Sequence, residues 1–204
     1  MDEARQVRDF WFGKLPLTAQ ALSQRLGLWF PEDESAAVAR NWDAAIRARF
    51  GKLVERAALG ELASWADSPR RCLSLILLLD QFPRNLYRGT ARAFATDDQA
   101  LAVTLSGVES AADAALDIVE RMFFYMPLQH SEAREVQDES VAGFRRLVAE
   151  APQELRSAFE SSLKYAEEHR SIIQRFGRFP SRNRALHRVS TPEELEWLRA
   201  GGDP

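Results

Sequence analysis

The chain has 204 residues, 46% hydrophobic and 28% charged, a composition that suits one sizeable globular core and excludes disordered and fibrous proteins. Its net charge of -3 gives no positive field over the whole molecule, so we expect no nucleic-acid partner and no attraction to an anionic membrane. The longest apolar run, Leu75 to Leu79, is far shorter than the roughly 18 residues of a membrane span.

The first half of the chain predicts short amphipathic helices separated by glycine and proline. Their expected ranges are residues 2–12, 18–26 and 33–50, followed by a short helix that ends near residue 60. Gly13 closes the first helix and Gly51 supplies a natural C-cap for the third. In that third helix, Val38, Trp42 and Phe50 recur at the spacing of one helical face.

A central buried helix is predicted next. Ser68 and Pro69 have the residue types of an N-cap and a first helical position, and the residues up to Leu79 are apolar on nearly every side. We therefore expect Leu75, Ile76, Leu78 and Leu79 among the deepest residues. The Phe82-Pro83 pair is expected to bend or end this helix, because proline removes a backbone donor.

Four further helices are expected in the second half, over residues 97–106, 112–125, 131–149 and 152–177. Thr191-Pro192-Glu193-Glu194 has the pattern of a capping box and begins a terminal helix through Trp197. No alternating β-branched stretch between hairpin turns is present. The sequence thus predicts an all-α fold of about 8–10 helices, in a single domain over residues 1–204.

Cysteine and histidine usage bears on compartment and metal binding. The single cysteine, Cys72, excludes an internal disulfide and fits a reducing compartment, and its apolar neighbours indicate a buried residue. The charged N-terminus lacks a secretory signal, so we expect a cytoplasmic protein. With three scattered histidines and no cysteine pair, no metal or other cofactor is expected. A metal site made by His130, Glu132 and His169 would require these distant segments to meet.

A run of arginines stands out near the C-terminus. Between Glu168 and Glu193 there are six arginines and no acidic residue. One interpretation is capture of a carboxylate or phosphate by guanidinium groups. The alternative is that they pair with acids such as Asp80, Glu120 and Glu132 and hold helix ends together. Phe82-Pro83-Arg84-Asn85 is echoed by Phe179-Pro180-Ser181-Arg182-Asn183, which predicts two similar helix exits that present arginine and asparagine.

Two histidines are candidate acid/base groups. His130 precedes Ser131 and Glu132, so an imidazole beside an orienting carboxylate is possible there. A hydrogen-bonded structural histidine is the alternative at this position. His169 borders an apolar helix face that includes Ile173. Phosphate-binding glycine loops, nucleophile elbows and zinc-protease motifs are absent from the sequence.

Four motifs in order give the chain a family resemblance. They are LDQFPRNLYRGT at 79–90, AFATD at 93–97, YMPLQHSE at 125–132 and IIQRFGRFP at 172–180. With these, the chain resembles the bacterial family called domain of unknown function 924 over nearly its whole length. The resemblance implies a tetratricopeptide-like helical array and no established activity. It also shows four departures, because the family pattern has Asp at the position of Ala63, Glu at Gln129, His at Ser181 and Gly at His187.

Three functional hypotheses remain open. The first is a binding module for an anionic small molecule or a peptide carboxylate, with a site formed by Arg84, Asn85, Arg88, His130, Arg178, Arg182 and Asn183. The second is an enzyme that acts on a carboxylate- or phosphate-bearing metabolite with His130 or His169 as acid/base. The third is a scaffold in which the motifs only join helices. The hypotheses differ in whether Arg84, His130 and Arg178 share one open pocket; none of them specifies an oligomeric state.

Overall fold

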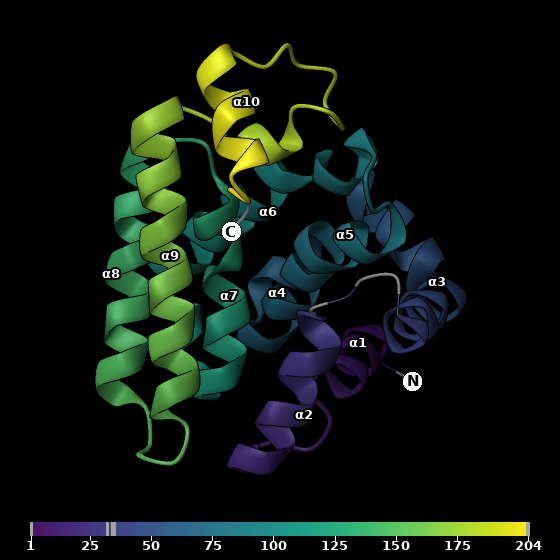
Figure 1. The fold of residues 1–204 in the computed structure, drawn as a ribbon. Helices are drawn as coiled ribbons and strands as arrows, with labels where there is room; N and C mark the ends of the chain where they lie inside the picture. The colour runs from purple at the N-terminus through teal and green to yellow at the C-terminus, as the bar shows by residue number, and fades with distance from the viewer. Residues whose placement is uncertain (1, 32, 34–35, 203–204) are drawn as a thin grey trace.

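The computed structural model describes residues 2–31, 33 and 36–202, and these residues form helices and turns with no β-strand. The predicted all-α class is confirmed. Figure 1 shows the α-helices, which are α1 (Glu3–Phe12), α2 (Ala19–Trp29), α3 (Ala37–Ala58), α4 (Pro69–Ile76), α5 (Phe82–Leu86), α6 (Asp97–Glu109), α7 (Ile118–His130), α8 (Arg134–Glu150), α9 (Arg156–Phe176) and α10 (Pro192–Arg199). In the part of the chain that is described, no helix is long and apolar enough to cross a membrane.

Several helix ends follow from the residues that the sequence indicates. The hydroxyl of Thr191 accepts the backbone N–H of Glu194 at 3.2 Å, while the Glu194 carboxylate accepts the N–H of Thr191 at 2.7 Å. These two bonds form the predicted capping box of α10. Gly177 ends α9 with φ +71°, a left-handed conformation that glycine adopts without steric strain. Gly13 likewise follows the last residue of α1.

The prediction for α3 is wrong at its C-terminal end. The helix continues through Gly51 to Ala58, and its buried face extends to Leu53 and Val54. The separate short helix expected before residue 60 is therefore the last part of α3. Residues 34 and 35 of the predicted range lie outside the described residues. α2 also runs farther than expected, to Trp29.

The boundaries of α7, α8 and α9 also differ from the prediction. α7 begins at Ile118, with Asp117 as its N-cap and Glu120 completing a capping box, and Pro127 lies inside the helix instead of beyond its end. Residues 112–115 form only a 3₁₀ turn. α8 begins after Ala133, whose N–H is accepted by the Ser131 hydroxyl at 3.2 Å. α9 begins at Arg156 and not at Pro152.

The predicted break at Pro83 is a π-helical turn within a continuing helix. The segment Leu77–Gln81 joins α4 to α5, and the N–H of Phe82 donates to the carbonyl of Leu77. Because Pro83 has no N–H, the carbonyl of Leu79 loses its usual helical donor. The hydroxyl of Thr96 donates to that carbonyl at 2.5 Å. The wide turn is thus stabilised from outside the helix.

This central helix lies in the main hydrophobic core. α4 packs against α1, α6 and α7, and α5 packs against α3. The four residues predicted to be deepest, Leu75, Ile76, Leu78 and Leu79, are at most 3% exposed. Cys72 is also buried, as expected, and burial raises the pKa of its thiol to about 11. The pattern of apolar residues therefore located the centre of the molecule.

The C-terminal part of the chain closes over one end of a helical layer. α8 packs against both α7 and α9, and the three lie side by side in Figure 1. A smaller hydrophobic cluster of Ile172, Ile173 and Phe179 with Phe176 and Trp197 joins the end of α9 to α10. This connection brings residues 182–188 to the same cavity as the start of α6 and the end of α7.

Candidate functional site

A cavity of about 230 Å³ opens between three segments that are distant in sequence. The start of α6, the end of α7 and the chain between α9 and α10 each contribute charged side chains. The lining residues are Phe94, Asp97, Asp98, Leu101, Pro127, His130, Ser131, Glu132, Arg182, Leu186 and Arg188. Two members of the predicted site, His130 and Arg182, line this cavity, whereas Arg84 and Arg178 do not.

Behind the cavity wall, Asp80 is fully buried in the π-helical segment. Its Oδ1 lies 2.6 Å from His130 Nδ1 and 3.1 Å from Arg84 Nη1, and its Oδ2 accepts from Gln81 Nε2 at 2.5 Å. Burial alone would raise the pKa of this carboxyl group, but Arg84 and His130 hold the pKa well below its usual range. Asp80 is therefore an ionised carboxylate in contact with an imidazole.

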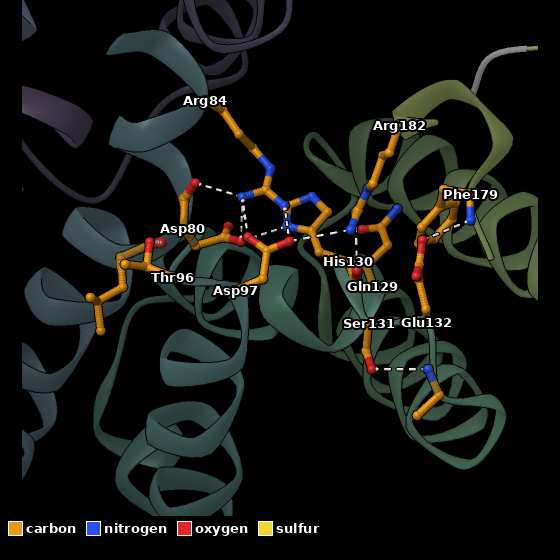
Figure 2. Close-up of polar contacts among 12 residues, drawn as sticks. Asp80, Arg84, Thr96, Asp97, Gln129, His130, Ser131, Glu132, Phe179 and Arg182 are labelled. Carbon is orange, nitrogen blue, oxygen red and sulfur yellow. Dashed lines mark hydrogen bonds and ion pairs between the residues drawn. The ribbon is translucent and has the colours of Figure 1, made fainter. Parts of the chain in front are cut away.

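Arg84 and Arg182 share the carboxylate of Asp97, as Figure 2 shows. Arg84 makes a bidentate contact with it at 2.9 and 3.0 Å, and Arg182 Nη1 donates to it at 3.2 Å. The cation of Arg84 is opposed by burial, yet Asp80 and Asp97 raise its pKa. Burial and the nearby Arg84 lower the pKa of Arg182 to about 10, which keeps Arg182 charged at neutral pH. Two guanidinium groups and two carboxylates thus balance one another.

His130 occupies the last position of α7, where Arg182 Nη2 donates to its backbone carbonyl at 3.0 Å. This bond satisfies one of the carbonyls that a helix end leaves without an intrahelical donor. The side chain of His130 is 15% exposed. Burial and Arg84 together lower the pKa of the imidazole, so it is neutral at pH 7.

Glu132 holds the C-terminal part of the chain against the cavity. Its Oε1 accepts the backbone N–H of Phe179 at 3.0 Å and the Arg188 guanidinium at 2.8 Å. Burial would raise the pKa of Glu132, but these two donors lower it. Glu132 and Arg188 therefore form an ion pair at the rim, and Arg188 was absent from the site predicted by the sequence.

The other predicted site residues lie in two ion-pair groups outside the cavity. Asn85 and Arg88 bind Asp43, with Nδ2 of Asn85 and Nε of Arg88 donating at 2.8 and 2.7 Å. Arg178 makes a bidentate contact with Glu194 at 2.7 and 2.8 Å, and Asn183 donates to the same carboxylate at 3.2 Å. The asparagines of the two Phe-Pro motifs, Asn85 and Asn183, thus donate to different carboxylates, whereas their arginines, Arg84 and Arg182, share Asp97.

His169 lies behind the cavity without lining it. Its Nδ1 is 2.7 Å from the carbonyl of Tyr165 and 3.3 Å from Nε2 of Gln129, and its ring packs edge-on against Phe179. Burial lowers the pKa of His169 to about 4. His187, the third histidine, has φ +54°, which is the left-handed region where the resembled family pattern has glycine. No group of three or more potential metal ligands occurs among the described residues.

The sequence pointed to Asp97 only as a helix start and did not select Asp98, Ser131 or Arg188 as site residues. A signal for Asp97 was present, because it closes the AFATD motif. Arg188 lies outside every motif, and its role depends on how the chain folds back after α9. A molecule bound in the cavity would therefore face guanidinium N–H groups, carboxylate oxygens and one imidazole.

Comparison with known proteins places these segments in a wider group. The family model described as bacterial protein of unknown function (DUF924) matches residues 7–202. A solved structure of a protein of unknown function from Agrobacterium tumefaciens is 34% identical, with a TM-score of 0.79 over 97% of each chain. No curated protein matches this chain. The residues matched by the family model include all the segments that line the cavity.

Proposed function

Since the chain belongs to the bacterial family of unknown function DUF924, we propose its function from its own cavity: a tetratricopeptide-like helical module that binds a small molecule bearing a carboxylate or phosphate. The successive packing of α7, α8 and α9, joined by short connections, supports the helical array. The binding site in this proposal is the cavity between α6, α7 and the C-terminal segment, by which we mean the chain between α9 and α10.

The observation that carries the proposal is the pair of guanidinium groups at the cavity. Arg182 uses Nη1 for Asp97 and Nη2 for the His130 carbonyl, and Arg188 uses Nη1 for Glu132. A guanidinium has five N–H donors. Within the described residues, the remaining donors of these two arginines have no hydrogen-bond acceptor. An oxyanion in the cavity provides acceptors for them.

The acidic lining restricts which anion fits. Asp97 and Glu132 already pair with arginines, while the Asp98 carboxylate has no hydrogen-bond or ion-pair partner among the described residues. A ligand that also carries a hydroxyl or ammonium group can donate a hydrogen bond to the Asp98 carboxylate. The volume of about 230 Å³ is below the range of roughly 300–1,000 Å³ typical of drug-sized ligands. We therefore favour a small amphoteric metabolite over a longer peptide.

The second candidate function is a scaffold. The ion pairs of Arg84, Arg88 and Arg178 favour a structural role for these three residues. Each makes a carboxylate contact that joins segments distant in sequence or caps a helix. For this reason the proposal assigns ligand binding to Arg182 and Arg188 and a structural role to the other three. A pure scaffold predicts no specific response to anions.

Thermal unfolding with phosphate, sulfate or malonate, against chloride at equal ionic strength, tests the proposal. A ligand at ten times its Kd stabilises the folded chain by about 1.4 kcal/mol, which raises Tm by roughly 3–6 °C for a chain of this size. We expect Arg188→Ala to lose this increment. Arg188 is 30% exposed with one carboxylate partner, so its removal leaves the core intact.

The matched control is Arg170→Ala. Arg170 is 29% exposed and also has one carboxylate partner, Asp138, but it does not line the cavity. This variant should keep the full anion increment. An increment of the same size in wild type, Arg188→Ala and Arg170→Ala would show that the cavity does not bind the anion.

A further inference from the structure

The contact between Asp80 and His130 fixes the tautomer of the imidazole. An ionised carboxylate only accepts hydrogen bonds, so at 2.6 Å the Nδ1 atom of His130 must carry the hydrogen. A neutral imidazole has one N–H, and the lone pair therefore resides on Nε2. Arg84 and Gln81 hold the same carboxylate, which prevents it from turning away.

The Nε2 atom of His130 is the unused end of this pair. Among the described residues, Nε2 has no hydrogen-bond partner. Some polar atoms of the described residues are both fully buried and without a partner, and Nε2 is not one of them. His130 lines the cavity together with Arg182. A basic nitrogen thus accompanies a guanidinium in one small space, with a buried carboxylate behind it, as Figure 2 shows.

The other two histidines differ from His130 in this respect. His169 has Nδ1 against the carbonyl of Tyr165 and no carboxylate contact, and it does not line the cavity. His187 is exposed and lies outside the cavity. Only His130, of the three, combines a buried carboxylate at one ring nitrogen with cavity access for the side chain.

We propose that His130 is a general base for a carboxylate- or phosphate-bearing substrate in this cavity, with Asp80 as its positioning residue. This inference rests on the binding function proposed above. The Nε2 lone pair takes a proton from an O–H or N–H group of the bound molecule, and the imidazolium that forms is stabilised by Asp80. The same proton then returns to another atom of the substrate, so the histidine is regenerated and no further reactant is required.

The charges around the imidazole set the pH range of this base. Asp80 and Arg84 face it from the central helix, Asp97 from α6 and Arg182 from the C-terminal segment, while His169 lies beyond Gln129. Burial has the largest effect on the imidazole pKa and lowers it, Arg84 lowers it further, and Asp80 and Asp97 raise it, so the neutral ring is favoured. We expect the base to be active at neutral pH and to lose activity below its lowered pKa.

Reaction with diethyl pyrocarbonate, followed by mass spectrometry of each histidine, tests the base. Nε2 attacks the carbonyl carbon of the reagent and displaces ethyl carbonate, so the rate reports a free lone pair. We expect His130 to react at least as fast as exposed His187. Asp80→Asn should slow His130 severalfold, because the neutral amide oxygen that then faces Nδ1 and Arg84 is a weaker acceptor than a carboxylate and leaves Nε2 less basic. The rate at His187 should not change, which makes it an internal control.

A measurement on the unaltered chain covers the case in which Asp80→Asn does not fold. The ¹⁵N spectrum of labelled histidine distinguishes a protonated ring nitrogen from one with a lone pair. Protonated Nδ1 and unprotonated Nε2 at pH 7 are the expected result for His130. Protonated Nε2 at pH 7, or an unchanged reaction rate in folded Asp80→Asn, would overturn the inference.

Phosphate in the same reaction separates this inference from the binding function. Protection of His130 by phosphate supports both. If phosphate raises Tm but His130 does not react with the reagent, binding stands and the base is refuted. If His130 reacts and phosphate neither protects it nor raises Tm, the reactive pair stands and anion binding is refuted.

Discussion

Asp97 and the three charged residues around it show how burial limits what an arginine can do. Asp80, Arg84, Asp97 and Arg182 lie largely out of solvent, and removal of one member of such a buried group typically costs about 3–5 kcal/mol. Arg84 is held by two carboxylates and has little freedom to bind a ligand. The residue types were visible in the sequence, but the pairing of Arg182 with Asp97 depends on packing across 85 positions.

His169 gives a pH-dependent prediction at the scale of one residue. Its folded pKa of about 4 lies below the ordinary value of about 6.5, so between these values the unfolded chain binds a proton that the folded chain does not. Its contribution is fully present above pH 6.5 and is lost as pH falls toward 4. We expect a loss on the order of 3 kcal/mol over this range, with His130 acting in the same direction.

Urea unfolding at pH 7, 5.5 and 4.5 measures this effect. His169→Gln should reduce the dependence. The carboxyl groups with lowered pKa values, including Asp80 and Glu132, lose their contributions only below about pH 4.5, outside most of this window. Equal pH dependence in wild type and His169→Gln would contradict the assignment.

At the scale of helices, Gly51 and Gly177 are a pair of glycines with opposite roles. Gly51 lies inside α3, and a Cβ atom built there meets no neighbouring atom within 4 Å. Gly51→Ala should therefore stabilise the chain by about 0.5–1 kcal/mol, because alanine loses less backbone entropy in a helix. Gly177→Ala should destabilise it by about 1–2 kcal/mol, since φ there is left-handed.

Urea denaturation of both variants checks the two signs. If Gly51 were the C-cap that the sequence suggested, Gly51→Ala would lose stability. A loss of stability would therefore support a shorter α3 that ends before Gly51.

Helix ends differ in how far local sequence signals predict them. Local signals sufficed for the capping box of α10 and for Gly177, because those side chains and dihedrals act within one turn. They failed at Gly51 and Pro127, where packing of the apolar face outweighs the local preference.

At the scale of the molecule, the candidate site is formed by chain segments that are distant in sequence. The sequence motifs identify these segments, but they do not predict which of them come into contact. The motifs around Asp97 and His130 supply two walls of the cavity. The third wall required a choice among the arginines after α9, and that choice follows from how Phe179 and Trp197 pack on α9. Arg178 turns to the capping box of α10, whereas Arg188 turns to Glu132. The sequence named Glu132 as a possible partner of these arginines without assigning it to Arg188, and it named no partner for Arg178.

The C-terminal segment therefore completes the cavity, and Glu132 is the contact that tests this. Glu132→Gln keeps an acceptor for the Phe179 N–H but removes the charge that holds Arg188. Loss of a charge-assisted contact of about 1–3 kcal/mol should loosen this segment more than the core. We expect hydrogen exchange to become roughly tenfold faster in residues 180–199, little change in α4 and α7, and loss of the anion-induced rise in Tm. Glu167→Gln, which removes an exposed pair with Arg145, is the control. Uniformly faster exchange across all helices would mean that Glu132 supports the whole fold, and unchanged exchange with an intact anion response would mean that the cavity does not depend on this contact.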